Sequence, residues 1–142
     1  MKIRSVMSTS PVRLEPDTTV AAAARMLARY NLGVLPVCGK DGKLRGIVTD
    51  RDLVLRCVAS GRDPNTTRVS QVMTGSVYTV EPDTDAALAA GIMGQKQVRR
   101  LPVVENGRLC GMVSLGDLAR QEELSYDAGD ALAEISGNVA PE

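Results

Sequence analysis

The fold of this chain is decided by a stretch that occurs twice. Gly-Ile-Val-Thr-Asp-Arg-Asp at residues 46–52 returns as Gly-Met-Val-Ser-Leu-Gly-Asp at residues 111–117. In both copies a glycine and two apolar residues precede a hydroxyl side chain, Thr49 or Ser114, and an aspartate follows three positions later. An apolar run that leads into Ser/Thr-x-x-Asp predicts a strand that gives way to a helix at the hydroxyl residue.

Other pieces of sequence recur in the same order, which indicates duplication of a whole unit. Pro36 and Pro102 stand 66 positions apart, whereas Gly46 and Gly111 stand 65 apart, so one residue is missing from a loop of the second copy. Units of about 60 residues are marginally stable alone. We therefore expect two halves that pack on one another about a pseudo-twofold axis, with paired clefts between them as the place for a ligand. The recurring pieces are Val-Met-Ser/Thr at 6–8 and 72–74, Glu-Pro-Asp-Thr at 15–18 and 81–84, and Leu-Pro-Val at 35–37 and 101–103.

Each copy predicts the element order β-α-β-β-α and therefore an α+β fold. The Ala-rich segments 19–30 and 85–96 have apolar residues at helical spacing, and Thr18 and Thr84 are the predicted N-caps. Asn-Gly at 106–107 is typical of a tight hairpin turn, so the missing residue falls in a hairpin loop. The other predicted elements are strands at 12–14, 77–80, 34–38 and 43–49 and helices at 50–59 and 115–122.

The formal net charge of zero hides an asymmetry along the chain. No Lys or Arg follows Arg120, so residues 1–120 carry all 17 basic residues but only 11 of the 17 acidic ones. Such a balance is typical of a solvated surface, and it also suits an anionic ligand held by the repeats. The six later acids are Glu122, Glu123, Asp127, Asp130, Glu134 and Glu142. The predicted domains are a first repeat at 1–60, a linker at 61–70, a second repeat at 71–124 and an acidic C-terminal helix and tail at 125–142.

Composition excludes several classes of function. The chain has no histidine, which excludes Ser-His-Asp and Cys-His catalysis and zinc sites that use histidine. Aromatic residues make up 2%, with no Phe or Trp, which argues against base-stacking platforms for nucleic acid. Cys38, Cys57 and Cys110 lack C-x-x-C spacing and read as reduced thiols, with packing in strands favoured over redox sensing for Cys38 and Cys110. No uncharged run approaches the ~20 residues of a membrane span, so we expect a soluble, cytoplasmic protein.

The repeated Ser/Thr-x-x-Asp turn has the chemistry to bind part of a nucleotide. It places a hydroxyl where a strand becomes a helix, at a point where backbone N–H groups and the helix dipole favour an anion. One turn later, Asp52 or Asp117 can accept hydrogen bonds from two neighbouring hydroxyls, as a ribose presents. The same pattern is also a capping box, whose side chains satisfy only their own backbone. Two copies at one place in a repeat favour nucleotide binding, and the two roles can coexist.

With these motifs the chain resembles a tandem pair of cystathionine β-synthase (CBS) domains, a Bateman module, over residues 1–122. It is most similar to the small stand-alone pairs of the hypoxic response protein type. The resemblance implies a regulatory, non-catalytic module that binds AMP, ADP, ATP or S-adenosylmethionine in the clefts between its repeats, requires no cofactor and pairs into a flat dimer. The motifs are Leu-Pro-Val-Cys-Gly at 35–39, Thr-Asp-Arg-Asp at 49–52, Asp-Pro-Asn-Thr at 63–66 and Val-Arg-Arg-Leu-Pro at 98–102.

The resemblance also implies roles for residues at the matching positions. Asp52 and Asp117 would hold ribose hydroxyls, and Thr49 and Ser114 would meet phosphate. Arg51 joins them as a candidate, because Asp50 and Arg51 can pair with each other, cap the helix or contact a ligand. The other implied ligand-binding residues are Thr18 and Thr84 beside the adenosine, Val34, Leu35, Pro36, Leu101 and Pro102 along the adenine, and Arg99 and Arg100 at the phosphate.

The two copies differ at the pair of arginines. Where the second copy has Arg99 and Arg100, the first has Gly33 and Val34. We therefore expect two unequal clefts, of which the one served by the arginines prefers ligands with phosphate. The alternative is that both arginines form salt bridges on the surface.

Two classes of function remain open at this point. The first is an adenine-nucleotide sensor that acts on a regulated partner protein, and the alternative is a ligand-free dimeric scaffold or interaction module. An enzyme is disfavoured because no nucleophile–base pair or metal cluster is visible, and nucleic-acid binding lacks a motif. We expect a homodimer, since 142 residues do not cover all the apolar helix faces that two such units present.

Overall fold

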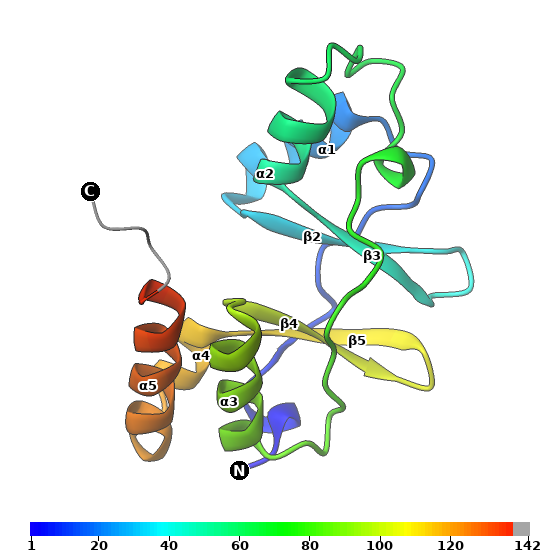
Figure 1. The fold of residues 1–142 in the computed structure, drawn as a ribbon. Helices are drawn as coiled ribbons and strands as arrows, with labels where there is room; N and C mark the ends of the chain where they lie inside the picture. The colour runs from blue at the N-terminus through cyan, green and yellow to red at the C-terminus, as the bar shows by residue number, and fades with distance from the viewer. Residues whose placement is uncertain (138–142) are drawn as a thin grey trace. The chain divides into compact units, whose positions relative to one another are not determined.

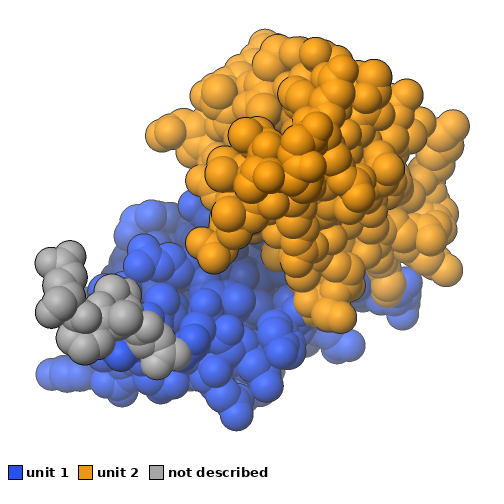
Figure 2. Space-filling view, turned by 45° about the horizontal axis from the view of Figure 1, so that its top comes forward, with its two compact units in different colours: residues 1–11, 78–106, 110–142 blue, residues 12–77, 107–109 orange. Residues whose placement is uncertain are grey.

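The computed structural model describes residues 1–137 and contains two compact units (Figures 1 and 2). Unit 2 consists of residues 12–77 and 107–109, and unit 1 contains residues 1–11, 78–106 and the described residues from 110 onward. Residues 1–11 open the first repeat but pack with the second. The predicted repeats at 1–60 and 71–124 are units of sequence and differ from these two units of structure, so their boundaries stay a prediction. Of the predicted acidic segment at 125–142, residues 138–142, including Glu142, lie outside the described residues.

The recurring Val-Met-Ser/Thr segments account for this division. In unit 1, β1 (Ser8–Thr9) pairs antiparallel with residues 111 and 112 of β5 (Arg108–Ser114), a strand whose first two residues belong to unit 2. In unit 2, Thr74 forms the matching antiparallel bridge with Ile47. The segment that opens each repeat therefore adds to the strands of the other repeat.

This pairing explains why both copies have glycine at the matching positions 46 and 111. A Cβ atom at Gly46 would lie 2.6 Å from the Thr74 carbonyl oxygen, and one at Gly111 would lie 2.7 Å from the Ser8 carbonyl oxygen. Both separations are well inside van der Waals contact. Only a residue without a side chain allows the neighbouring backbone to pass so closely.

Unit 2 contains the elements of the first repeat. Strands β2 and β3 are antiparallel neighbours, with Val34 opposite Thr49 and an irregularity at Val37/Cys38. The predicted strand at 12–14 is reduced to one parallel bridge between Leu14 and Val37. The bounds are α1 Val20–Tyr30, β2 Val34–Cys38, β3 Leu44–Thr49 and α2 Asp50–Leu53, followed by a π-helical turn at Val54–Val58 and a 3-10 turn at Val69–Gln71.

Unit 1 contains the matching elements and one more helix. Its sheet has the order β1-β5-β4, and the predicted strand at 77–80 is a single parallel bridge between Val80 and Val103. Asn106 and Gly107 both have positive φ, 53° and 78°, which confirms the tight hairpin. The bounds are α3 Ala86–Lys96, β4 Arg100–Glu105, α4 Leu115–Ala119 and α5 Ser125–Ser136, with 3-10 turns at Ile3–Ser5 and Glu122–Leu124. The predicted α+β class is confirmed.

Small side chains allow α5 to pack closely on α3 in unit 1 (Figure 1). Ala128 and Ala131 of α5 are buried in the same cluster as Ala90 of α3. A Cβ atom at Gly94 would lie 3.1 Å from the Ala131 Cα atom, so the two backbones are almost in contact there. The described residues contain no helix long and apolar enough to cross a bilayer.

The predicted N-caps were wrong by one residue. Thr19, not Thr18, caps α1, because its side chain accepts a hydrogen bond from the Ala22 N–H at 3.2 Å. Asp85 caps α3, while the Thr84 hydroxyl accepts from the Glu81 N–H of the preceding turn at 3.0 Å. The threonine that follows Glu-Pro-Asp thus stabilises the turn before the helix in the second copy.

The helices after the repeated motif are shorter than predicted. Helix α2 has four residues before the π-helical turn begins, so the predicted helix at 50–59 is not uniform. Helix α4 ends at Ala119 rather than at 122, because the chain turns there to bury Leu124 in the core. Helices this short have small dipoles, so any attraction of an anion to their N-termini must come mainly from charged side chains nearby.

All three cysteines are free thiols. Cys38 and Cys57 are buried, and Cys110 is half-buried. Burial raises the pKa of the Cys38 thiol and that of the Cys110 thiol above the ordinary value. Because the thiolate is the reactive form, this favours the packing interpretation over redox sensing.

Candidate functional site

Both Ser/Thr-x-x-Asp turns form complete capping boxes. The Asp52 N–H donates to the Thr49 hydroxyl oxygen at 3.0 Å, and the Thr49 N–H donates to Asp52 Oδ2 at 3.0 Å. In unit 1 the same pair of bonds joins Ser114 and Asp117 at 3.0 and 2.8 Å. The capping-box interpretation is confirmed, and it leaves one carboxylate oxygen, Oδ1, of each aspartate outside the box.

The surroundings of that second oxygen differ between the units. In unit 1, Asp117 Oδ1 forms an ion pair with Arg120. In unit 2, the Thr74 hydroxyl donates to the Asp52 carboxylate at 3.4 Å, and Arg56 Nε lies 3.8 Å from Asp52 Oδ1. Asp52 is buried, with 8% of its surface exposed, so this carboxylate is part of the packed structure.

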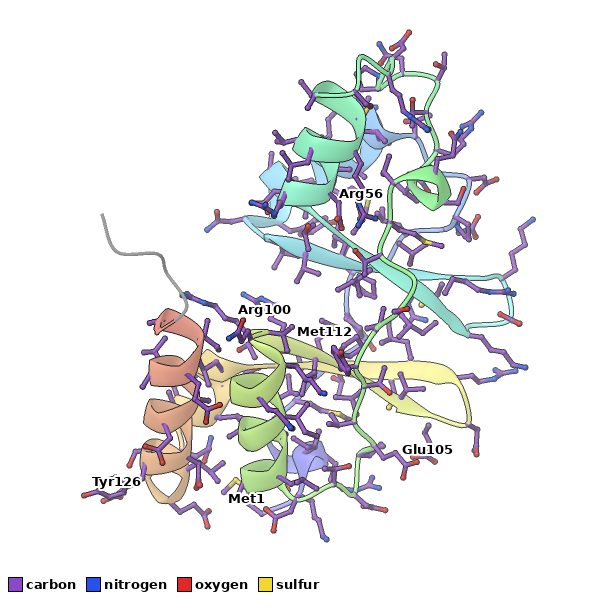
Figure 3. All side chains as sticks on the ribbon, in the orientation of Figure 1. Met1, Arg56, Arg100, Glu105, Met112 and Tyr126 are labelled. Atoms are coloured by element: carbon purple, nitrogen blue, oxygen red, sulfur yellow. The ribbon has the colours of Figure 1, made fainter. Side chains whose placement is uncertain are left out.

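Arg56 and Arg120 therefore differ in what they contact besides the aspartate. Arg56, labelled in Figure 3, also donates through Nη1 to the Val72 and Met73 carbonyl oxygens at 3.3 and 3.1 Å. Arg56 thus links the π-helical turn to the segment at 72–73, which follows the linker. Arg120 has 70% of its side chain exposed, and it faces a cavity.

The cavity in unit 1 has a volume of about 560 Å³ and is rich in arginine. Arg99 and Arg100 precede and begin β4, respectively, and the Arg99 carbonyl oxygen accepts from the Leu115 N–H at 2.8 Å. This bond holds the arginine pair beside the turn that begins α4. The residues that line the cavity are Arg99, Arg100, Ser114, Leu115, Gly116, Ala119 and Arg120, with Ser125, Ala128, Gly129 and Leu132 of α5.

The matching region of unit 2 contains a carboxylate instead. Asp50 takes the place of Leu115, and its N–H donates to the Gly33 carbonyl oxygen at 3.1 Å. A Cβ atom at Gly33 would lie 4.0 Å from Asp50 Oδ2, so the acid stands beside the position that Arg99 has in unit 1. A hollow of about 320 Å³ here is lined by Asp50, Arg51, Val54 and Leu55.

The predicted candidates in unit 2 are thus only partly brought together. Thr49 and Asp52 bind each other in the capping box. The Arg51 backbone N–H donates to Asp50 Oδ1 at 2.8 Å, so Asp50 and Arg51 are joined by a bond from backbone to side chain. Val34 is half-buried, whereas Leu35 and Pro36 are buried. The Pro36 carbonyl oxygen accepts from the Leu14 N–H at 2.9 Å, and Thr18 lies in the turn before α1.

In unit 1, four of the predicted candidates meet at one place. Arg99, Arg100 and Ser114 line the cavity, and Asp117 is joined to Ser114 and Arg120. Leu101 and Pro102 are buried, and the Pro102 carbonyl oxygen accepts from the Val80 N–H at 3.1 Å. Neither of these residues nor Thr84 is among those that line the cavity.

Sequence reasoning missed Arg120 and the wall formed by α5. A signal for Arg120 was present, because an arginine three residues after a helical aspartate lies on the same face. No signal placed Ser125 and Gly129 of α5 at the cavity, since that contact depends on how α5 packs.

Comparison with known proteins agrees with this architecture. The family model described as CBS domain matches residues 3–58 and 69–123. The chain belongs to the CBS-domain family. CBS domain-containing protein YhcV of Bacillus subtilis is 39% identical over 134 residues, which cover 94% of each chain. Stand-alone CBS-domain proteins are typically non-catalytic regulatory modules.

Solved structures of CBS proteins share the fold. The crystal structure of Hypoxic Response Protein I with two coordinated zinc ions has a TM-score of 0.79 and 34% identity, and the match covers 85% of this chain and 98% of that one. The resemblance to the hypoxic response protein type is thereby confirmed. In the described part of this chain, no group of three or more His, Cys, Asp or Glu is placed to hold a metal ion.

Two related structures contain adenosyl ligands. CBSX2 in complex with AMP has a TM-score of 0.75 and 28% identity, with coverage of 84% of this chain and 93% of that one. The CBS domain pair of protein MJ0100, in complex with 5-methylthioadenosine and S-adenosyl-L-methionine, has a TM-score of 0.74 and 26% identity, with coverage of 84% and 94%. CBS pairs of this fold therefore bind adenosine derivatives with and without phosphate.

Proposed function

We propose that this protein is a regulatory module without catalytic activity that binds an adenosyl ligand, and that the cavity of unit 1 receives the phosphate end of AMP, ADP or ATP. The observation that carries the proposal is the meeting of three arginines with the Ser114 hydroxyl around one cavity. The AMP bound to CBSX2 supports the choice of ligand class.

The chemistry of the cavity suits phosphate. A guanidinium group is permanently charged and presents forked N–H donors that match phosphate oxygens. Arg99 and Arg100 have no acidic ion-pair partner within 4.0 Å among the described residues. Their charge is therefore directed at the cavity and the solvent rather than neutralised within the unit.

A ligand panel tests the proposal. Isothermal titration of the protein with adenosine, AMP, ADP, ATP and S-adenosylmethionine should show heat of binding, with the phosphate-bearing ligands tighter than adenosine. The preference should weaken in 0.5 M salt, because added ions screen charge attraction. Absence of binding by every ligand at millimolar concentration would refute the proposal and leave the dimeric scaffold as the better description.

Substitution of the two aspartates separates capping from binding. Asp52→Ala and Asp117→Ala should both lower the melting temperature, since each removes a capping box. Asp117→Ala should in addition weaken AMP by roughly ten- to hundredfold, the value of a charge-assisted hydrogen bond. If both variants lose stability and neither loses affinity, the aspartates are caps only.

We also propose that the protein is a homodimer that associates through the α1–α2 face of unit 2. An apolar groove of about 490 Å³ runs along this face, and Val54 and Val58 are 54% and 65% exposed. The matching α3–α4 face of unit 1 is covered by α5. Within residues 1–137, α5 is the one helix that covers such a face, so the occupant proposed for the open face is the same face of a second copy. The groove is lined by Val20, Ala21, Ala24, Leu27, Asp50, Leu53, Val54, Val58 and Pro64.

Sedimentation at tens of micromolar tests the dimer. The wild-type protein should sediment as a dimer, and Val58→Asp should sediment as a monomer because it places a charge in the apolar contact. Tyr126→Asp is the matched control, since Tyr126 is 88% exposed and points away from α5 in Figure 3. A monomeric wild-type protein contradicts the proposal.

A cytoplasmic location and a regulated partner protein complete the proposal. The buried free thiols of Cys38 and Cys57 suit a reducing compartment. Affinity capture with and without AMP, followed by mass spectrometry, should identify a protein whose retention depends on the nucleotide. A set of captured proteins that is identical with and without AMP argues against nucleotide-dependent partnership.

A further inference from the structure

Arg120 occupies a position that is peculiar to the second copy. In the first copy the matching residue is Leu55, which has no charge. Arg120 follows the last residue of α4 and has 70% of its side chain exposed, yet it is held in place by its ion pair with Asp117. It therefore stands at the edge of the unit 1 cavity without being needed for the packing of the core.

The Arg120 guanidinium and the Ser114 hydroxyl face the same point. A methyl group added at Gly116 would lie 3.6 Å from Arg120 Nη1 and 3.7 Å from Ser114 Oγ. Because residue 116 is glycine, the space above it stays open to a ligand atom. A phosphate group that enters the cavity over Gly116 therefore comes between the Arg120 guanidinium and the Ser114 hydroxyl, while Arg99 and Arg100 line the same cavity.

The same guanidinium also engages the carboxylate that would bind the sugar. Asp117 Oδ2 accepts the Ser114 N–H inside the capping box, and Oδ1 is paired with Arg120. Sugar hydroxyls that approach Asp117 therefore meet an Oδ1 atom that already accepts from Arg120 and has one acceptor position left. Arg120 has 70% of its side chain exposed and Asp117 only 14%, so the guanidinium is the partner that can turn away, and the exchange requires sugar hydroxyls to take its place on Oδ1.

We propose that Arg120 determines the specificity of unit 1 by exchanging partners, which deepens the proposed function and rests on it. When the ligand carries phosphate, the guanidinium turns from Asp117 to the phosphate and releases Oδ1 to the sugar. When the ligand lacks phosphate, the guanidinium stays on Asp117 and competes with the sugar. The residue thus favours AMP and opposes adenosine.

This exchange predicts effects of opposite sign from one substitution. In Arg120→Ala, the affinity for AMP should fall about tenfold, because a charge-assisted contact to phosphate is lost. The affinity for adenosine should rise in the same variant, because Asp117 Oδ1 is released. Both affinities are measured by isothermal titration at one low ionic strength, where charge effects are least screened.

Two further variants control for indirect effects. Arg4→Ala removes another exposed ion pair of unit 1, with Asp83 at 2.7 Å, and Arg4 is not among the residues that line the cavity. It should change neither affinity. Arg120→Lys keeps the charge but not the fork, so its AMP affinity should lie between those of the wild type and Arg120→Ala.

The outcomes separate the two proposals. If the wild-type protein binds AMP and adenosine but Arg120→Ala weakens both equally, or neither, the exchange is wrong and the proposed function stands. If adenosine affinity falls while AMP affinity is kept, the exchange is also wrong. If the wild-type protein binds neither ligand, the proposed function fails and the exchange fails with it.

Discussion

The two units use one turn for the same structural purpose and surround it with different charged side chains. Thr49 and Ser114 begin capping boxes of nearly equal geometry. Around the second turn stand Arg99, Arg100 and Arg120, whereas the first has Asp50 beside Gly33. The Ser/Thr-x-x-Asp motif is thus a structural element that both copies need, and the residues around it differ in a way that would select the ligand.

The largest expected effect comes from making unit 1 resemble unit 2. In the double variant Arg99→Gly, Arg100→Val, the affinity for AMP and ATP should fall about a hundredfold, since two charged contacts to phosphate are lost. Adenosine affinity should change little. Titration of all three ligands measures the difference, and equal losses for adenosine and ATP would show that the arginine pair only faces solvent.

The repeated glycine should be equally sensitive in both units. Gly46→Ala and Gly111→Ala each force a methyl group against a neighbouring carbonyl oxygen, which should lower the free energy of unfolding by about 1–3 kcal/mol. Gly91→Ala in α3 is the control, because a Cβ atom there meets nothing within 4 Å and alanine favours the helix. Denaturant unfolding reports the values. Unchanged stability in the first two variants would mean that the exchanged segments do not pack as described.

The capping hydroxyls should act alike in stability and differently in binding. Thr49→Ala and Ser114→Ala should each lower the free energy of unfolding by about 1 kcal/mol, the usual value of an N-cap. Only Ser114→Ala should weaken AMP, because three arginines line the cavity beside Ser114, whereas the hollow in unit 2 has one arginine and the carboxylate of Asp50. A comparable loss of AMP affinity in Thr49→Ala would contradict the assignment of phosphate to unit 1.

The smallest effect concerns the two hairpins. The Lys43 N–H holds the pKa of Asp41 below its ordinary value of 3.8, whereas the matching turn in unit 1 has Asn106. A depressed pKa in the folded protein stabilises it above pH 3.8, and this contribution is lost as the pH falls through the lower folded value. The Lys43 amide should exchange faster with solvent in that acid range, and the effect should be absent in Asp41→Asn. Equal exchange at pH 3 and pH 5, after correction for intrinsic rates, would contradict it.

Local pattern was enough to predict most of the elements. The strand at 34–38 has the predicted bounds, because a Pro-containing apolar run between a helix and a Gly-rich turn leaves few alternatives. The N-caps were displaced by one residue, since Thr18 and Thr19 offer the same hydroxyl and only the backbone geometry distinguishes them. Helix α4 ended early because the burial of Leu124 depends on tertiary packing.

The candidate site was predicted less completely, for the same kind of reason. The duplicated motif identified Ser114 and Asp117, and the difference between the copies identified Arg99 and Arg100. The approach of α5 to the cavity and the pairing of Arg120 with Asp117 depend on contacts within the folded unit. The exchange of the opening segments was also missed, because a repeat in the sequence does not say which copy a segment packs against.

We propose above all that unit 1, and not the matching region of unit 2, binds the phosphate of an adenine nucleotide. Amide chemical shifts of this 15.1 kDa chain during a titration with AMP test it most directly. We expect the amide signals of Arg99, Arg100, Gly116 and Arg120 to shift, while those of Gly33, Asp50 and Leu55 keep their positions. Equal or larger shifts at Gly33, Asp50 and Leu55, or no shifts at all, would contradict it.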